Sequence, residues 1–303
     1  MKAVRLHSPG GVDNLVYEDV DTPAPRAGEA LVRVHAAAIT RDELNWPVDR
    51  LPAIPSYEVS GTVAAIGERV TEFEVGHAVY ALTGFERDGV AAEFAAVPAE
   101  RLTPKPKTLR HVESAAIPLP ALSAMQGLFD HGDLEKDQRV LIHGGGGGVG
   151  AYAVQVAHLH GAYLIATASG ERVEAARTLG ADEVIDHTVA DFSAIAPVNL
   201  VFDTVGGDRL VRSLSILEPG GRLVSVAEEP PHGISADHGV DCSFFIVEPN
   251  RDQLDELARL ADHGQLRVLV DSTYSLADAR EAFERSLDRS GLGKVVLQVV
   301  GDA

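Results

Sequence analysis

The sequence predicts an α/β protein in which a β-rich domain is interrupted by a doubly wound parallel sheet. Residues 1–117 form short runs of alternating polar and apolar residues broken by Pro and Gly, which is typical of strands and turns. Between residues 118 and 264, short apolar runs alternate with stretches of helical pattern, and this alternation indicates parallel strands with helices on both faces. A run of glycines directly after the first of these apolar runs marks the start of the parallel sheet.

The individual elements follow from these patterns. In the β-rich part, residues 29–35 and 78–82 and stretches of 59–70 alternate with period two. The expected strands of the parallel sheet are 139–143, 163–168, 183–186, 199–203, 221–226 and 243–247. The C-terminal stretch contains a helical pattern, 276–287, and a strand, 294–300; it is too short to fold alone and should return to complete the first domain. We therefore expect one domain from 1–117 and 265–303 and a second from 118–264.

The segment LIHGGGGGVG at 141–150 predicts dinucleotide binding. Gly145, Gly147 and Gly150 have the G-x-G-x-x-G spacing, in which one glycine makes a tight turn, one lets the backbone approach a pyrophosphate, and one lets the helix pack on the sheet. The start of the following helix offers unpaired N–H groups to the phosphates. A glycine-rich surface loop would match the spacing by accident, but the strand before it and the helix after it favour binding. Because no Lys-Ser or Lys-Thr follows Gly150, the loop is not a P-loop.

Composition excludes several classes of function. The net charge of −19 argues against binding to a nucleic-acid backbone, which requires clustered Lys and Arg. Cys242 is the single cysteine, so internal disulfides and thiolate-rich zinc sites are excluded. No apolar stretch reaches 18 residues, and the first residues lack the apolar core of a signal peptide, so we expect a cytosolic protein without a membrane span.

The end of the second strand of the parallel sheet bears on the choice of cofactor. NAD enzymes usually place an acidic residue there to bind the ribose hydroxyls, and this strand tip has none. Ser169 and Arg172 are instead suited to hold a 2′-phosphate, which favours NADPH over NADH. Glu171 weakens this interpretation, and Arg172 is also consistent with a solvated residue at a helix start.

Six segments together resemble the medium-chain dehydrogenase/reductase superfamily, and within it the zinc-independent quinone oxidoreductase (zeta-crystallin-like) branch. They are IPSYEVSG at 54–61, VTEFEVGHAVY at 70–80, LIHGGGGGVG at 141–150, LGADEVID at 179–186, VFDTVGG at 201–207 and GKVVL at 293–297. The resemblance covers essentially the whole chain. It implies a GroES-like β-barrel catalytic domain plus a Rossmann domain with a doubly wound parallel sheet, an active site in the cleft between them, and a homodimer.

The glycine loop, the tip of the second strand and the resemblance together give a set of expected cofactor-binding positions, all in the Rossmann domain except Lys294. The expected residues are Gly145, Gly147, Gly148, Val149, Gly150, Ser169, Arg172, Asp203, Val205, Val226, Ala227, Phe245 and Lys294.

The zinc ligands of alcohol dehydrogenases in this superfamily are missing, so we expect no metal. The first two ligand positions fall on Thr40 and Tyr57, and the third lies in a segment near Ala115 without Cys, His or Asp. Without zinc an ordinary ketone is a poor hydride acceptor, whereas a quinone or an α,β-unsaturated carbonyl spreads the developing charge by conjugation. Thr40, Arg41 and Tyr57 are the candidates to line the acceptor oxygen's site. Tyr57 is also consistent with a buried packing residue.

The leading prediction is therefore an NADPH-dependent reductase of quinones or activated alkenes, acting on a small molecule. A dedicated biosynthetic enoyl reductase and a cofactor-binding protein without turnover remain alternatives. The apolar segment 240–247 reads as the edge strand of the sheet, and an unpaired apolar edge favours a homodimer.

Overall fold

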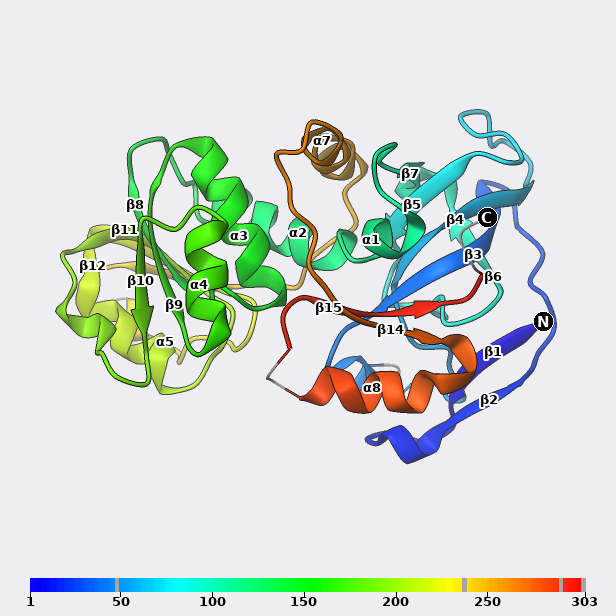
Figure 1. Cartoon of the computed structure of the whole chain (residues 1–303), viewed down its shortest axis with the longest axis horizontal. Coiled ribbons are helices and arrows are strands. Elements are labelled where there is room, and N and C mark those ends of the chain that lie inside the picture. The colour runs from blue at the N-terminus through cyan, green and yellow to red at the C-terminus, as the bar shows by residue number, and fades with distance from the viewer. Residues whose placement is uncertain (47–48, 236–238, 289–290, 301–303) are drawn as a thin grey trace. The chain divides into compact units, whose positions relative to one another are not determined.

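The computed structural model describes residues 1–46, 49–235, 239–288 and 291–300, which divide into two compact units (Figure 1). Unit 1 consists of Met1–Leu119 and Glu248–Ala303, and unit 2 of Pro120–Val247. The second boundary lies earlier than the expected position after residue 264, because helix α7 (Arg251–Asp262) packs with unit 1. The Tyr80 hydroxyl donates to the carbonyl of Leu254 at 2.6 Å, and the Thr108 amide donates to Asp262 at 2.9 Å.

Unit 1 is built around the long strand β3 (Glu29–Ile39). Its sheet has the order β14-β15-β3-β4-β5-β7, and β6 pairs with the first half of β3. The bounds are β4 (Glu58–Ile66), β5 (Ala78–Leu82), β6 (Phe94–Pro98), β7 (Thr103–Pro104), β14 (Val270–Ser275) and β15 (Lys294–Gln298). Strand β15 pairs antiparallel with β3, so the expected return of the C-terminal segment to the first domain is confirmed. The sequence did not predict β14, which is mostly polar and lies at the edge of the sheet.

The remaining elements of unit 1 surround this sheet. Strands β1 (Lys2–Leu6) and β2 (Leu15–Asp19) form a separate antiparallel pair, and α1 (His111–Ala115) contacts β3 and β4. Helix α8 (Ala279–Leu287) begins after a 3-10 turn at Leu276–Asp278 and buries Ala282 and Phe283 in the main core. Figure 1 shows α8 alongside β14 and β15.

Unit 2 is a six-stranded parallel sheet of order β10-β9-β8-β11-β12-β13. Strands β8 (Arg139–His143), β9 (Tyr163–Ala168) and β10 (Glu183–Asp186) have the expected bounds, while β11 (Val198–Asp203), β12 (Leu217–Ser225) and β13 (Asp241–Phe244) differ at their ends. Helices α3 (Gly148–His160) and α4 (Glu171–Thr178) lie side by side in Figure 1; α2 (Pro118–Met125) precedes the sheet, and α5 (Asp208–Arg212) follows β11. The chain order reverses between β8 and β11, and in such sheets ligands bind at the carboxyl ends of the strands at this reversal.

Candidate functional site

The glycine loop after β8 needs its glycines for three different physical reasons. Gly144 has φ +76° and makes the turn, so this role belongs to a residue outside the expected G-x-G-x-x-G set. A Cβ on Gly150 would lie 2.1 Å from the carbonyl oxygen of Gly144, and a Cβ on Gly145 would lie 2.6 Å from the Cβ of Ala166 on β9. Gly145 and Gly150 therefore allow the loop and the helix start to pack closely.

Gly147 and Gly148 leave an open surface at the start of α3. A Cβ on Gly147 would meet only the Gly144 carbonyl oxygen, at 3.2 Å, and one on Gly148 would meet nothing within 4 Å. The amides of Gly148, Val149 and Gly150 belong to the first turn of α3, where N–H groups precede the helical hydrogen-bond ladder. This bare backbone with its aligned N–H groups fits a pyrophosphate.

The end of β9 brings Ser169 and Arg172 next to this loop. The Arg172 amide donates to the Ser169 carbonyl at 3.3 Å, so both residues belong to the turn that starts α4. A Cβ on Gly146 would lie 2.5 Å from the Cβ of Arg172, which shows how closely this arginine packs under the glycine loop. Glu171 is exposed, whereas Ser169 and Arg172 are half-buried.

At the ends of β11 and β12, Asp203 organises the expected cofactor-binding turn from below. Its fully buried carboxylate accepts hydrogen bonds from the amides of Val205 and Gly206 at 3.0–3.1 Å and from the Ser225 hydroxyl at 2.9 Å. The Ser225 hydroxyl in turn accepts from the Ala227 amide at 3.2 Å. Asp203 therefore holds the backbone turns that contain Val205, Val226 and Ala227. Both of its carboxylate oxygens already accept hydrogen bonds within the protein.

His143, the last residue of β8, was not singled out from the sequence. Its ring nitrogens lie 3.1 Å from the Thr167 hydroxyl and 2.8 Å from the Ser213 hydroxyl, and the residue is fully buried. Burial, together with the charge of Arg209, lowers the pKa of His143 to about 3. The neutral imidazole thus connects β8 to β9 and to the 3-10 turn Ser213–Ile216 after α5, next to the glycine loop.

Two expected cofactor-binding side chains are already engaged within the protein. Phe245 is 7% exposed, and its ring stacks on His131 with centroids 4.3 Å apart. Lys294 lies in unit 1, on β15, where its ammonium is 2.5 Å from a carboxylate oxygen of Glu58. No sequence pattern predicts these partners, because they come from segments far apart in the chain.

In unit 1, Lys294, Glu58 and Thr40 form a buried hydrogen-bonded network. The Lys294 ammonium donates to the Thr40 hydroxyl at 2.9 Å, and the second carboxylate oxygen of Glu58 accepts from the Leu119 amide at 2.9 Å. Glu58 is fully buried and Lys294 nearly so, whereas Thr40, directly after β3, is half-buried. Thr40 is therefore the outermost polar group of this network.

Glu43 adds a second buried carboxyl next to the network. The Ser56 hydroxyl is 3.5 Å from its Oε1, and Oε2 has no hydrogen-bond partner among the described residues. Burial raises the pKa of Glu43 to about 8, and the positive charge of Lys294 offsets only part of this effect. With one ammonium and two carboxyls buried together, Glu43 holds its proton at neutral pH.

Tyr57 is fully buried, and its hydroxyl is 3.2 Å from a guanidinium nitrogen of Arg50, which donates to it. Burial raises the pKa of Tyr57, so the phenol stays neutral. Its ring packs between those of Trp46 and Phe85. From the sequence we expected Tyr57 to contact the acceptor directly. In the structure its hydroxyl accepts a hydrogen bond from Arg50, a residue that the sequence analysis did not single out.

Arg41 is half-buried, and its Nε donates to the carbonyl of Ser286 at 3.1 Å. The contact ties the residue after Thr40 to helix α8.

At the positions of the missing zinc ligands, the structure thus has a threonine hydrogen-bonded to a lysine and a tyrosine hydrogen-bonded to an arginine. No cluster of three or more His, Cys, Asp or Glu side chains with metal-binding geometry occurs among the described residues. Within the same part of the chain, no helix is long and apolar enough to cross a membrane.

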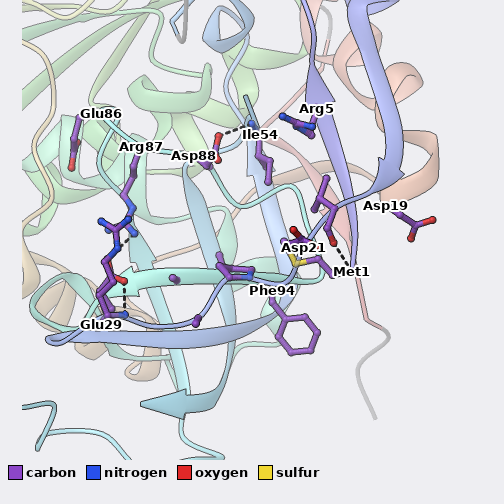
Figure 2. Close-up of a pocket in the computed structure, with 17 residues that line it drawn as sticks. Met1, Arg5, Asp19, Asp21, Glu29, Ile54, Glu86, Arg87, Asp88 and Phe94 are labelled. Atoms are coloured by element: carbon purple, nitrogen blue, oxygen red, sulfur yellow. Dashed lines mark hydrogen bonds and ion pairs between the residues drawn. The ribbon is translucent and has the colours of Figure 1, made fainter. Parts of the chain in front are cut away.

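A separate cavity of about 1070 Å³ opens elsewhere on unit 1 and contains none of the predicted site residues (Figure 2). Several of its charged residues form hydrogen bonds with one another or with the backbone. Arg87 donates to Glu29 at 2.9 Å, and Asp88 accepts from the Ile54 amide at 3.0 Å. We assign it no role in the chemistry.

Comparison with known proteins places this architecture in a family. Residues 26–107 match the alcohol dehydrogenase GroES-like domain, and residues 179–297 match the zinc-binding dehydrogenase domain. The chain is 32% identical to a probable mitochondrial zinc-binding oxidoreductase of Arthroderma benhamiae, over 94% of this chain and 93% of the relative. It is 31% identical to a chloroplastic NADPH-dependent alkenal/one oxidoreductase of Arabidopsis thaliana, over 98% of this chain and 79% of the relative.

Among solved structures, the quinone oxidoreductase of Coxiella burnetii superposes with a TM-score of 0.92 at 28% identity, covering 99% of both chains. The two domain matches, these identities and the shared fold lead to one conclusion. The chain belongs to the medium-chain dehydrogenase/reductase superfamily, in its quinone oxidoreductase branch.

Proposed function

We propose that this protein is an NADPH-dependent oxidoreductase that reduces a quinone or an α,β-unsaturated carbonyl compound without zinc. The observation that carries the proposal is the replacement of the metal position by Thr40, whose hydroxyl accepts a hydrogen bond from the buried ammonium of Lys294. The names of the relatives support the reaction class, because they include an alkenal/one oxidoreductase and a quinone oxidoreductase.

The cofactor would be held by the carboxyl edge of the unit 2 sheet. The open backbone at Gly147 and Gly148 and the first amides of α3 would bind its pyrophosphate. The turn supported by Asp203 and Ser225 would carry Val205, Val226 and Ala227 to the nicotinamide end. When bound, the reduced nicotinamide supplies a hydride.

Unit 1 would polarise the acceptor. A hydroxyl that accepts a hydrogen bond from an ammonium becomes a better donor itself, because successive hydrogen bonds polarise one another. Thr40 is half-buried and forms the outer end of such a chain from Lys294. Its O–H donates to Glu58 Oε1 at 3.4 Å, and it would turn from this long hydrogen bond to donate to a carbonyl oxygen. This donor is weaker than a metal ion, and it therefore suits an acceptor whose conjugation already spreads the developing charge.

NADPH is favoured over NADH by the residues that follow β9. Ser169 and Arg172 lie in one turn beside the glycine loop, and Glu171, the first residue of α4, lies between them in sequence and is exposed. A hydroxyl and a guanidinium at this place match a 2′-phosphate, whereas NAD would be expected to have a carboxylate at the strand tip.

A homodimer through the unit 2 sheet is also proposed, because β13 ends the sheet and apolar side chains follow it outward. Phe244 is 39% exposed and Ile246 is 67% exposed. An apolar edge of this kind is a common site for pairing between subunits.

The proposed activity is tested by following NADPH oxidation with panels of quinones, enones, enoyl thioesters and simple aldehydes. We expect turnover of quinones or enones, no oxidation of ethanol by NADP, and unchanged rates after exhaustive treatment with chelators. Turnover confined to one enoyl thioester would instead identify a dedicated enoyl reductase. NADPH binding without turnover of any acceptor would contradict the proposal.

A further inference from the structure

Arg50 occupies an unusual position among three aromatic rings of unit 1. The ring centroid of Tyr57 is 5.8 Å from that of Trp46 and 5.2 Å from that of Phe85, and the Trp46 and Phe85 centroids are 5.1 Å apart. Tyr57 is fully buried, whereas Trp46 and Phe85 are half-buried, so the cluster has one buried ring and two partly exposed rings. Arg50 donates a hydrogen bond to the hydroxyl of the buried Tyr57.

The hydrogen bonds of Arg50 are incomplete. One terminal nitrogen donates to both the Tyr57 hydroxyl and the Phe85 carbonyl, and the other is 3.5 Å from the highly exposed carboxylate of Asp49. The Nε of Arg50 is buried and has no hydrogen-bond partner among the described residues. Buried donors are nearly always paired, so the guanidinium of Arg50 keeps hydrogen-bonding capacity that the described residues do not use. Because the Nε is buried and the side chain is 24% exposed, an incoming acceptor atom would meet the terminal nitrogens.

A flat molecule with a carbonyl oxygen matches these features. Trp46 and Phe85 are half-buried, and aromatic rings favour packing with another planar ring. A guanidinium binds oxygens that carry negative charge. On the basis of the proposed function, we propose that Arg50, Trp46 and Phe85 bind the ring and one carbonyl oxygen of a 1,4-quinone, with Arg50 stabilising the charge that develops on that oxygen. Tyr57 then acts as a positioning residue that holds the guanidinium.

A quinone has two carbonyl groups, and unit 1 has two donors to match them. Thr40 lies at the end of the Lys294 network, and Arg50 lies in the aromatic cluster. Glu43 connects these environments, because its amide donates to the Thr40 carbonyl at 3.2 Å and its neutral carboxyl accepts from the hydroxyl of Ser56, the residue before Tyr57. A simple enone has one carbonyl oxygen and uses one donor, so quinones are the preferred acceptors.

The step attributed to Arg50 is the accumulation of charge on oxygen. The hydride would add to a ring carbon conjugated with the carbonyl group and bring two electrons, while the nicotinamide would be oxidised. The electron pair of the conjugated system would move onto the carbonyl oxygen and give an enolate anion, which takes one proton from water. A proton shift from the ring carbon that received the hydride to the second oxygen then gives the hydroquinone. Arg50 pairs with this anion before it is protonated and stays protonated throughout.

Trp46 is the only tryptophan in the chain, so its fluorescence reports directly on this cluster. We suggest titrating the protein without cofactor with 2-hydroxy-1,4-naphthoquinone, which is a planar anion at neutral pH. Saturable quenching is expected for the unmodified protein, and Arg50→Gln should weaken the apparent affinity at least ~10-fold, as expected for the loss of a charge-assisted contact.

Arg101→Gln is the matched control, because the Arg101 side chain has the same 24% exposure as Arg50 and pairs with the exposed Glu86. It should titrate like the unmodified protein. Arg50→Lys keeps the charge but loses the planar fork and should recover only part of the affinity. Equal affinity in Arg50→Gln and the unmodified protein, with both variants folded by circular dichroism, would overturn the proposal, as would the absence of saturable quenching.

Turnover separates this inference from the proposed function. In Arg50→Gln, kcat/KM for 1,4-benzoquinone should fall ~100-fold, the order found when one oxyanion donor is removed, while the Kd of NADPH stays unchanged. The fall should be markedly smaller for a monocarbonyl enone such as 2-cyclohexenone. Equal losses for both acceptors, or no loss at all, would reject the role of Arg50 and leave the reductase activity standing. Saturable, Arg50-dependent quenching without turnover of any acceptor would reject the proposed activity and leave the binding site standing.

Discussion

At the scale of single residues, two glycines of one loop differ in how much space each has for a side chain. Gly150 has no room for a side chain, because a Cβ there would lie 2.1 Å from a backbone oxygen that cannot move away. Gly147 is much less confined, since its Cβ would meet only one atom, the Gly144 carbonyl oxygen at 3.2 Å, which would have to shift slightly. The fold therefore constrains Gly150, whereas the main constraint on Gly147 would come from the proposed pyrophosphate.

Gly147→Val should abolish NADPH binding while leaving the unfolding temperature nearly unchanged, because the added methyl groups would occupy the space of the pyrophosphate. Isothermal titration and thermal melts measure the two effects separately. Gly150→Ala is the contrasting variant and should lower the melting temperature of the protein. If Gly147→Val binds NADPH with unchanged affinity, the glycine run is not the phosphate-binding loop.

At the scale of elements, the proposed cofactor preference rests on the start of α4. Ser169 lies just before this helix, Glu171 and Arg172 are its first two residues, and Arg172 packs against Gly146 of the neighbouring loop. The position of this turn is fixed by β9, which pairs with β8 and β10 and is almost fully buried.

Arg172→Glu should weaken NADPH binding ~100-fold or more, because a 2′-phosphate would then face two carboxylates in place of a guanidinium, and the affinity for NADH should change little. Fluorescence titration with each cofactor gives both constants. The conservative variant Arg172→Lys should keep the preference for NADPH. A parallel loss for both cofactors would mean that Arg172 supports the loop and does not recognise the phosphate.

At the scale of the whole molecule, buried ionisable groups give the two units different responses to pH. The pKa of His143 in unit 2 is lowered to about 3, so its contribution to stability is present above the ordinary value of 6.5 and is lost as the pH falls. The pKa of Glu43 in unit 1 is raised to about 8 from its ordinary value of 4.5. Its contribution is fully present below pH 4.5 and is lost as the pH rises through 8.

Glu43→Gln should therefore stabilise the protein selectively at high pH. At pH 5 the variant and the unmodified protein should melt at similar temperatures, because both carry a neutral side chain at this position. At pH 8.5 the variant should melt higher by about 3 °C or more, since it avoids ionising a buried carboxyl. Differential scanning calorimetry across this range measures the difference, and a difference independent of pH would show that Glu43 is not the titrating group.

The proposed dimer is also a property of the whole molecule. Ile246→Asp should shift the protein from dimer to monomer in light scattering, because a charge would replace an exposed apolar side chain next to β13. Val189→Asp is the control, as Val189 is 83% exposed and lies away from that strand in sequence. A monomer at all concentrations of the unmodified protein would refute the dimer.

By itself, the sequence determined the parallel sheet and the cofactor loop. Three of the six predicted strands, 139–143, 163–168 and 183–186, have the bounds found in the structure. Their buried apolar runs are bounded by turn residues, and both signals are local in the chain. The glycine spacing is local too, although only the backbone geometry showed that Gly144 makes the turn.

The proposed acceptor site could not be predicted in this way, because it depends on contacts that form only in the folded protein. Lys294 and Thr40 are 254 residues apart, and the pairing of β15 with β3 brings them together. The contact between Arg50 and Tyr57 spans only seven residues, yet it depends on the irregular segment before β4, which has no periodicity to interpret. Helix α7 joined unit 1 for the same reason: its amphipathic pattern specifies a buried face but not the surface that covers it. Sequence patterns fix elements, whereas the pairing of buried charges and faces depends on which elements the fold brings into contact.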